Sequence, residues 1–127
     1  MKSKGGPEAR VSRSGRRGYV RSVRYDPFRK RLIDAVVNTP GDATPELRQA
    51  VLDRAMGSRD GVPPDLRPYV DTVVRHAYRV TDSDLTGLQQ AGNSEDALFE
   101  ITVAAAVGAA LHRLDRGLAA LRGEEPD

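Results

Sequence analysis

The chain has 127 residues, of which 39% are hydrophobic and 30% are charged, a composition typical of one soluble globular domain. It contains no cysteine, which excludes disulfides, thiol nucleophiles and thiolate metal sites. The N-terminal region lacks the apolar segment of a secretory signal, and the most apolar run, 97–111, is shorter than the roughly 20 residues of a membrane span. We therefore expect a cytoplasmic protein with no membrane partner.

The net charge of +2 conceals an uneven distribution. Residues 1–31 contain eleven Lys or Arg against two acidic residues, so the rest of the chain is acidic. Residues 1–25 are rich in Gly, Ser and Arg and are predicted to form a disordered basic arm. This arm either keeps the protein soluble or binds an acidic partner such as nucleic acid. Its candidate contacts are Arg13, Arg16, Arg17 and Arg21.

Two helices with the same kind of start follow the arm. Asp26 is a predicted N-cap, with Pro27 at the first helical position. Thr44 and Pro45 repeat this arrangement for a second helix, which Gly57 is expected to end. Both segments carry apolar residues on one face, which is typical of helices that pack on a core.

Three further helices complete the predicted fold. The third is expected from about Pro64 to Arg79, with Pro68 in its first turn, and a short fourth helix starts with a capping arrangement at Thr81. Ser94 is the predicted cap of a long fifth helix. The expected fold is all-α, a bundle of about five helices over residues 26–123, with 124–127 frayed.

The long fifth helix is apolar nearly all the way round over 97–111, so it is not expected to have one face in water. Small residues lie four apart, Ala104 with Gly108 and Ala105 with Ala109, and allow helix backbones to approach closely. We expect part of this surface to be buried between subunits. The alternative is a central helix that is fully wrapped within one chain.

Three polar residues share one flank of the third helix: Tyr69, Thr72 and His76. They are predicted to line a pocket, with His76 the plausible acid–base group at neutral pH. The alternative is a boundary histidine that is hydrogen-bonded to a neighbour. The core stripe of this helix comprises Leu66, Val70, Val73, Val74 and Ala77, while Asp71, Arg75 and Arg79 are expected to face water.

Two segments carry a family resemblance. The frame from Tyr69 to His76 corresponds to a CxxCxxxH motif with both cysteines replaced, and "SEDALFEITVAAAVGAALHRL" has an acidic cap leading into an Ala-rich helix. In these features residues 63–121 resemble the carboxymuconolactone decarboxylase and alkylhydroperoxidase D-like family. The resemblance implies an all-α protein that assembles as a trimer or hexamer.

The departure from the family motif decides which chemistry is possible. Neither Tyr69 nor Thr72 can supply the nucleophilic and resolving thiols, so thiol peroxidase activity is excluded. The family's upstream glutamate also has no match. The resemblance therefore implies a cysteine-free member of unknown ligand or substrate, either a binding protein or an enzyme with non-thiol chemistry on a small carbonyl or lactone. Whether it is an enzyme stays open.

Metal and cofactor sites find little support in the sequence. His76 and His112 are the two imidazoles and lie on different predicted helices, and no phosphate-binding glycine motif is present. We predict no metal and no cofactor. His112 is expected either to complement the dipole at the end of the last helix or to line a pocket between subunits. The rival function is an interaction module that acts through the basic arm.

Overall fold

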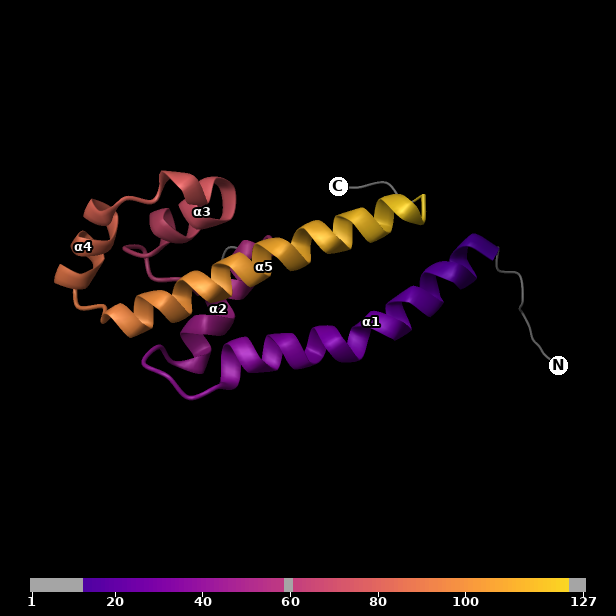
Figure 1. The fold of residues 1–127 in the computed structure, drawn as a ribbon, viewed down its shortest axis with the longest axis horizontal. Coiled ribbons are helices and arrows are strands. Elements are labelled where there is room, and N and C mark those ends of the chain that lie inside the picture. Colours follow the sequence, from indigo (N-terminus) through magenta and orange to yellow (C-terminus); the bar gives the residue numbers. More distant parts are fainter. Residues whose placement is uncertain (1–12, 59–60, 124–127) are drawn as a thin grey trace. The chain divides into compact units, whose positions relative to one another are not determined.

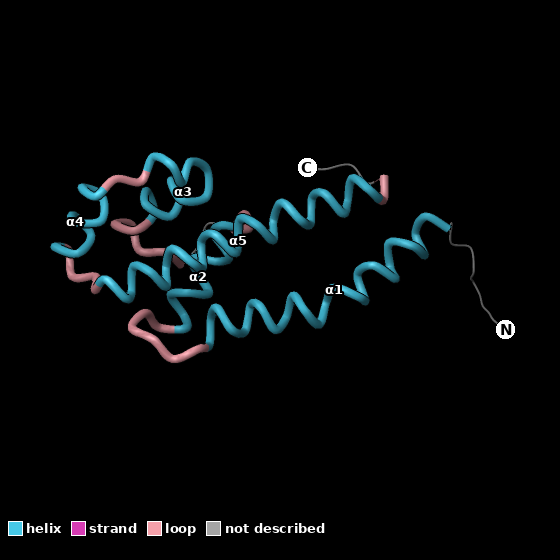
Figure 2. The backbone as a smooth tube through the Cα atoms, viewed as in Figure 1, coloured by secondary structure: helices cyan, strands magenta, loops and turns pink. Residues whose placement is uncertain are grey.

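The computed structural model describes residues 13–58 and 61–123, and for 13–24 it describes the backbone alone. Every regular element within these ranges is helical, which confirms the all-α prediction. The chain divides into two compact units, Ile33–Leu114 and a smaller one that comprises the residues before Ile33 and those from Asp115 onward. The elements are α1 (Arg13–Asn38), α2 (Pro45–Ala55), α3 (Arg67–His76), the 3-10 turn η2 (Ala77–Arg79), α4 (Asp82–Gln90) and α5 (Glu95–Leu121) (Figures 1 and 2).

The first helix starts earlier than its sequence signals predict. α1 begins at Arg13, so the start predicted at Asp26 is wrong and Pro27 lies inside the helix. Pro27 lacks an N–H and removes one helical hydrogen bond, but capping preferences are local tendencies that helical turns on both sides can override. Residues 13–25 are therefore helical rather than disordered, while 1–12 and 124–127 lie outside the described residues.

The predicted N-terminal caps of the other helices are present. The Thr44 hydroxyl accepts the backbone N–H three residues later at 3.1 Å, and Thr81 forms a reciprocal capping box with Asp84. The Ser94 hydroxyl accepts the N–H of Ala97 at 3.0 Å at the start of α5. Each cap satisfies an N–H that has no partner within its own helix, which is why these residue types mark helix starts.

Helix α3 is shorter at both ends than predicted. It starts at Arg67 rather than at Pro64, which places Pro68 in the first turn, where its missing N–H costs no hydrogen bond. It ends at His76, whose φ of −148° and ψ of 63° leave helical geometry, and the next three residues form η2. Ala77, predicted in the core stripe, is consequently exposed.

The core of Ile33–Leu114 forms around one side of α5. Leu98, Ile101, Ala104 and Ala105 of this helix are buried among residues of α2, α3 and α4. Gly108 allows a particularly close approach to α2, since a Cβ there would lie 2.6 Å from the Leu52 carbonyl oxygen. The small residues expected at a subunit interface, Ala104, Ala105, Gly108 and Ala109, are thus buried within the chain itself.

Two charged side chains form hydrogen bonds with the backbone of the loop between α1 and α2. Glu100 of α5 accepts the N–H groups of Asp42 at 3.1 Å and Ala43 at 2.7 Å. Arg48 of α2 is only 3% exposed and donates to the carbonyl oxygens of Ala43 and Val36, both at 3.1 Å. The loop's backbone groups are therefore satisfied by side chains from two neighbouring helices.

In the smaller unit, α1 and α5 are joined by an ion pair. The Arg29 guanidinium donates to both carboxylate oxygens of Asp115, at 2.5 and 2.9 Å. Both side chains are partly exposed, so this pair orients the two helix segments but contributes little net stability.

Candidate functional site

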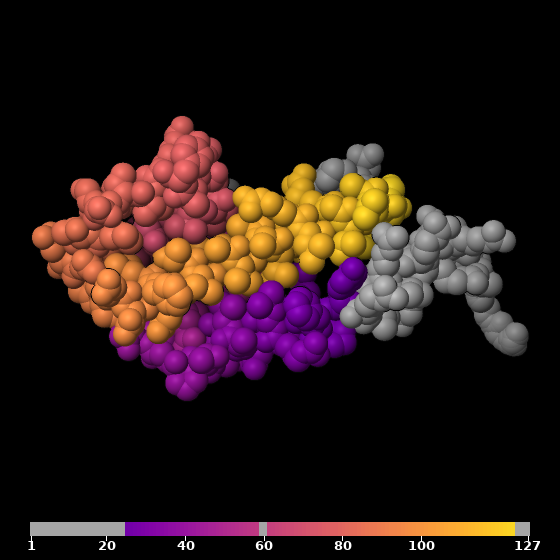
Figure 3. Space-filling model, in the orientation of Figure 1, coloured from indigo at the N-terminus to yellow at the C-terminus, as the bar shows by residue number. Residues whose placement is uncertain are grey.

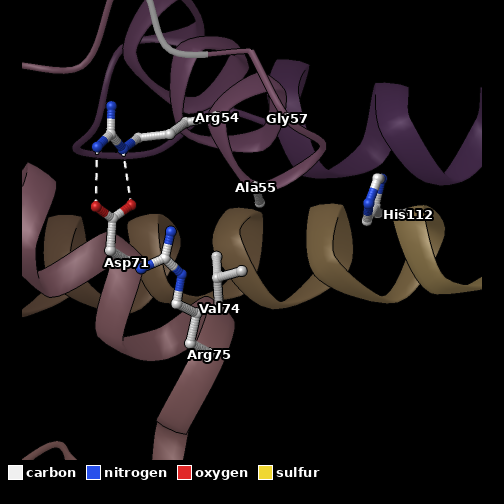
Figure 4. A pocket seen from close by; sticks show the side chains of 7 residues that line it. All are labelled: Arg54, Ala55, Gly57, Asp71, Val74, Arg75 and His112. Atoms are coloured by element: carbon white, nitrogen blue, oxygen red, sulfur yellow. Dashed lines mark hydrogen bonds and ion pairs between the residues drawn. The ribbon is translucent and has the colours of Figure 1, made fainter. Parts of the chain in front are cut away.

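A small pocket opens between α2, α3 and α5, entirely within Ile33–Leu114. Its volume is about 180 Å³. This is enough for a compact ligand close to the size of benzene, which fits a cavity of about 150 Å³, but it is below the size of most drug-binding sites. The lining combines charged groups with small apolar ones. The lining residues are Arg54, Ala55, Gly57, Asp71, Val74, Arg75 and His112 (Figure 4).

One wall of the pocket is a two-pronged ion pair. Arg54 at the end of α2 donates from Nε and from Nη2 to the two carboxylate oxygens of Asp71 on α3, each at 2.8 Å. Only 12% of the Arg54 side chain is exposed, compared with 35% for Asp71. The hydrogen bonds to Asp71 raise the pKa of Arg54 above its ordinary value, opposed by burial, so this guanidinium stays charged. The pair gives the pocket a rigid polar wall.

A second guanidinium lies at the same end of the pocket. Arg75 is exposed on α3, one turn after Asp71, and Figure 4 shows its guanidinium reaching back toward the Arg54–Asp71 pair. Among the described lining residues, two guanidinium groups and one carboxylate leave this end with a net positive charge. Because a guanidinium presents several donors in a plane, the geometry suits a carboxylate.

The opposite end of the pocket carries an imidazole. His112 of α5 is half-buried and lies across from the arginines, with Ala55 and Val74 between them in Figure 4. The pocket therefore has a cationic end, an apolar middle and a hydrogen-bonding far end. His112 lies nine residues before Leu121 and so precedes the last turn of α5, where it would have to lie to complement the helix dipole.

Of the three residues of α3 predicted to line one pocket, Tyr69 and Thr72 lie together and His76 does not. The Tyr69 and Thr102 hydroxyls form a 2.6 Å hydrogen bond, and the Thr72 hydroxyl donates to the Pro68 carbonyl at 2.8 Å. Tyr69 and Thr72 do share a pocket, of about 190 Å³, between α3 and α4. Its remaining lining residues are Asp65, Pro68, Asp84 and Leu88.

His76 is not among the residues that line the pocket of Tyr69 and Thr72. It is exposed, and its ring meets the edge of Tyr78 with the ring centres 5.8 Å apart. The helical projection fails here because the backbone of His76 has already left the helix. The side chains of Arg13, Arg16, Arg17 and Arg21 lie outside the described residues, so their proposed contacts stay predictions.

Sequence patterns missed most of the α2–α3–α5 pocket. Asp71 was expected to face water, yet it is bonded to Arg54. Asp71 and Arg75 are four residues apart on α3, a spacing that could have indicated a charged face. No local spacing indicates that Arg54 and His112 join them, since they come from two other helices.

Comparisons of the chain with protein-family models, with curated proteins and with solved structures found no match. Among the residues that the structure describes, no group of three or more His, Asp or Glu is placed to hold a metal ion.

Helix α5 is long and apolar enough to span a membrane by length and composition. The mean hydropathy of its most apolar 18 residues is 1.4, and 44% of this stretch is buried. The core helix of a soluble protein can have the same length and composition, so the predicted absence of a membrane partner stays a prediction.

Proposed function

We propose that this protein binds a small organic carboxylate in the pocket between α2, α3 and α5. The observation that carries the proposal is the pair of guanidinium groups, Arg54 and Arg75, at one end of a pocket of about 180 Å³. Asp71 offsets one of these two charges, so the site attracts a single anionic group. Charge-assisted hydrogen bonds of this kind contribute about 1.5–3 kcal/mol each.

The rest of the pocket favours an organic acid over an inorganic anion. Ala55 and Val74 supply an apolar middle that a phosphate or sulfate ion cannot use, whereas a short hydrocarbon or a small ring can fill it. His112 then offers a hydrogen bond to a polar group at the far end of the ligand. A molecule of the size of benzoate or succinate fits this description.

Binding, rather than covalent catalysis, is the activity that the lining residues support. The seven described residues that line this pocket include neither a hydroxyl nor a thiol nucleophile. Asp71 is committed to Arg54, which leaves His112 as the group suited to proton transfer.

The test is a titration of the whole chain with benzoate, succinate and inorganic phosphate, followed by calorimetry and by NMR shifts of residues around the pocket. We expect saturable binding of a carboxylate and weaker binding of phosphate. Arg75→Gln should reduce carboxylate affinity by about tenfold or more, since it removes a charged donor. Arg79→Gln removes the same charge outside the pocket and serves as the matched control.

Two outcomes would refute the binding proposal. One is the absence of saturable binding for every carboxylate probe. The other is equal carboxylate affinity in the unaltered chain, the Arg75→Gln variant and the Arg79→Gln control.

Kinship with the carboxymuconolactone decarboxylase and alkylhydroperoxidase D-like family remains a second proposal. Its support is the order of elements: α3 carries the frame from Tyr69 to His76, a short α4 follows, and the long Ala-rich α5 comes next. A cysteine-free relative that binds a small carboxylate would be consistent with both proposals. An experimental structure with unrelated helix packing would separate the chain from that family and leave the binding proposal standing.

A further inference from the structure

Within Ile33–Leu114, the second side of α5 is apolar and is not covered by the other described residues of this unit. Figure 3 shows the atoms of α5 between residues 95 and 114 open on the face in view. Phe99 is 68% exposed and Leu114 is 43% exposed, although the opposite side of the helix is fully buried. We define the open α5 face as Phe99, Val103, Ala106, Ala110 and Leu114, which are exposed or half-buried.

The spacing on this face is that of a helix–helix seam. Its members recur at intervals of four and three residues, so they form one stripe along α5, as the inner positions of paired helices do. The stripe is also graded in size. Phe99 and Val103 are large and lie toward the N-terminal end, while Ala106 and Ala110 are small and follow them.

Charged residues complete the pattern at both ends. Asp96 lies three residues before Phe99, and Arg113 lies three residues after Ala110; both are exposed and lie within about 60° of the stripe's centre on a helical projection. Between Asp96 and Arg113 the order along the helix is therefore acidic, large, large, small, small, basic, and Leu114 lies outside this paired stretch. This order is complementary to itself when read in the opposite direction.

We propose that a second copy of this chain binds the open α5 face in antiparallel orientation. The two copies are related by a two-fold axis that crosses this face at the level of residues 104–105 along the helix. In this register Phe99 lies against Ala110 of the second copy, Val103 against Ala106, and Asp96 against Arg113. Large side chains then fill the space beside small ones, and opposite charges meet at each end. The pairing buries the exposed Phe99 ring, which removes apolar area from water.

Complementary charge and size favour this occupant over a lipid bilayer. A span through α5 would have to expose its buried face, and that face packs against α2, α3 and α4 in the folded chain. A contact made by one helix face lies at the small end of the range for stable interfaces, so the dimer is expected to be weak and concentration-dependent.

Cysteine cross-linking tests the orientation, because the natural chain has no cysteine to interfere. In the proposed register the two Ala106 positions are about 4.5 Å apart along the helix axis, whereas the two Phe99 positions are about 16 Å apart. Ala106→Cys should therefore form a disulfide-linked dimer, and Phe99→Cys should not link to itself. Phe99→Cys mixed with Ala110→Cys should link efficiently. Self-linking of Phe99→Cys, or no linking in the mixture, would overturn the proposal.

A charge swap tests the register in solution by sedimentation over a range of protein concentrations. Asp96→Arg alone and Arg113→Asp alone should each weaken dimerisation about tenfold or more, since like charges then meet. The double variant should restore it. This restoration matters because Arg113 also donates to the Val74 carbonyl at 3.1 Å, so the single variant could act within its own chain.

Three sedimentation results would overturn the dimer proposal: a monomer at every concentration, a trimer, or a double variant as weak as the single ones. Partition into phosphatidylcholine vesicles by a chain that does not dimerise would assign the face to a membrane and overturn it too. Asp96 and the three residues changed to cysteine lie outside the carboxylate pocket, so either proposal can fail without the other.

Discussion

Glu100 on α5 accepts the N–H of Ala43 at 2.7 Å and so ties the α1–α2 loop to the long helix. The hydrogen bond from the Ala43 N–H lowers the pKa of Glu100 most, against the opposing effect of burial, and the hydrogen bond from the Asp42 N–H and the charge of Arg48 lower it further. A carboxyl group with a lowered pKa in the folded state stabilises the fold when it is ionised.

The first prediction concerns acid stability. The contribution of Glu100 should be fully present above the ordinary glutamate pKa of about 4.3 and should be lost as the pH falls through the lower pKa of the folded state. Glu100→Gln should therefore lower the free energy of unfolding at pH 7 by about 1–3 kcal/mol and show a smaller loss on acidification. Urea unfolding at pH 7 and at pH 3 measures both effects. Glu95→Gln, on the same helix, is the control, and an equal pH dependence in both variants would contradict the prediction.

A second prediction concerns the close crossing of α5 and α2. Gly108→Ala should destabilise the fold by about 1–3 kcal/mol, because the new Cβ would lie 2.6 Å from the Leu52 carbonyl oxygen and 2.6 Å from the Ala55 Cβ. Gly117→Ala on the same helix meets no atom within 4 Å and should stabilise by about 0.5–1 kcal/mol through helix propensity. Thermal unfolding of the two variants measures the contrast. Shifts of the same sign would show that the crossing is less tight than the structure has it.

A third prediction concerns the buried Arg48. Arg48→Met should cost about 2–4 kcal/mol, since it leaves the Val36 and Ala43 carbonyl oxygens without their donor and the Glu100 charge without a nearby cation. The exposed Arg79→Met is the control and should change stability little. Chemical denaturation gives the comparison, and an Arg48→Met chain as stable as the control would refute a structural role.

A fourth prediction separates the residues of α3 by role. Tyr69→Phe should lower stability by about 1 kcal/mol, because it removes the hydrogen bond to Thr102, and it should leave carboxylate binding unchanged. His76→Ala should change neither property, since His76 is exposed and lines neither Tyr69's pocket nor the carboxylate pocket. Denaturation and ligand titration of both variants provide the readouts. Loss of ligand binding in His76→Ala would restore that residue as a site candidate.

The helix starts show what local sequence can predict. Thr44, Thr81 and Ser94 form the predicted caps because each acts on an N–H three residues away, a distance that the sequence alone defines. The same local reasoning was wrong at Asp26 and Pro27, where helical residues on both sides outweighed a good start signal. It was also wrong at His76, because this residue is the last of α3 and its backbone angles are no longer helical.

The sequence by itself determined the all-helical class, the caps of α2, α4 and α5, the apolar character of α5 and the exclusion of thiol chemistry, because these depend on composition and on residues within a turn or two of each other. Only the tertiary structure decided that Arg54 meets Asp71, that Arg75 and His112 share their pocket, and which side of α5 is covered. Those outcomes depend on which helices pack together, and residues 17 or more positions apart carry no local signal of that choice.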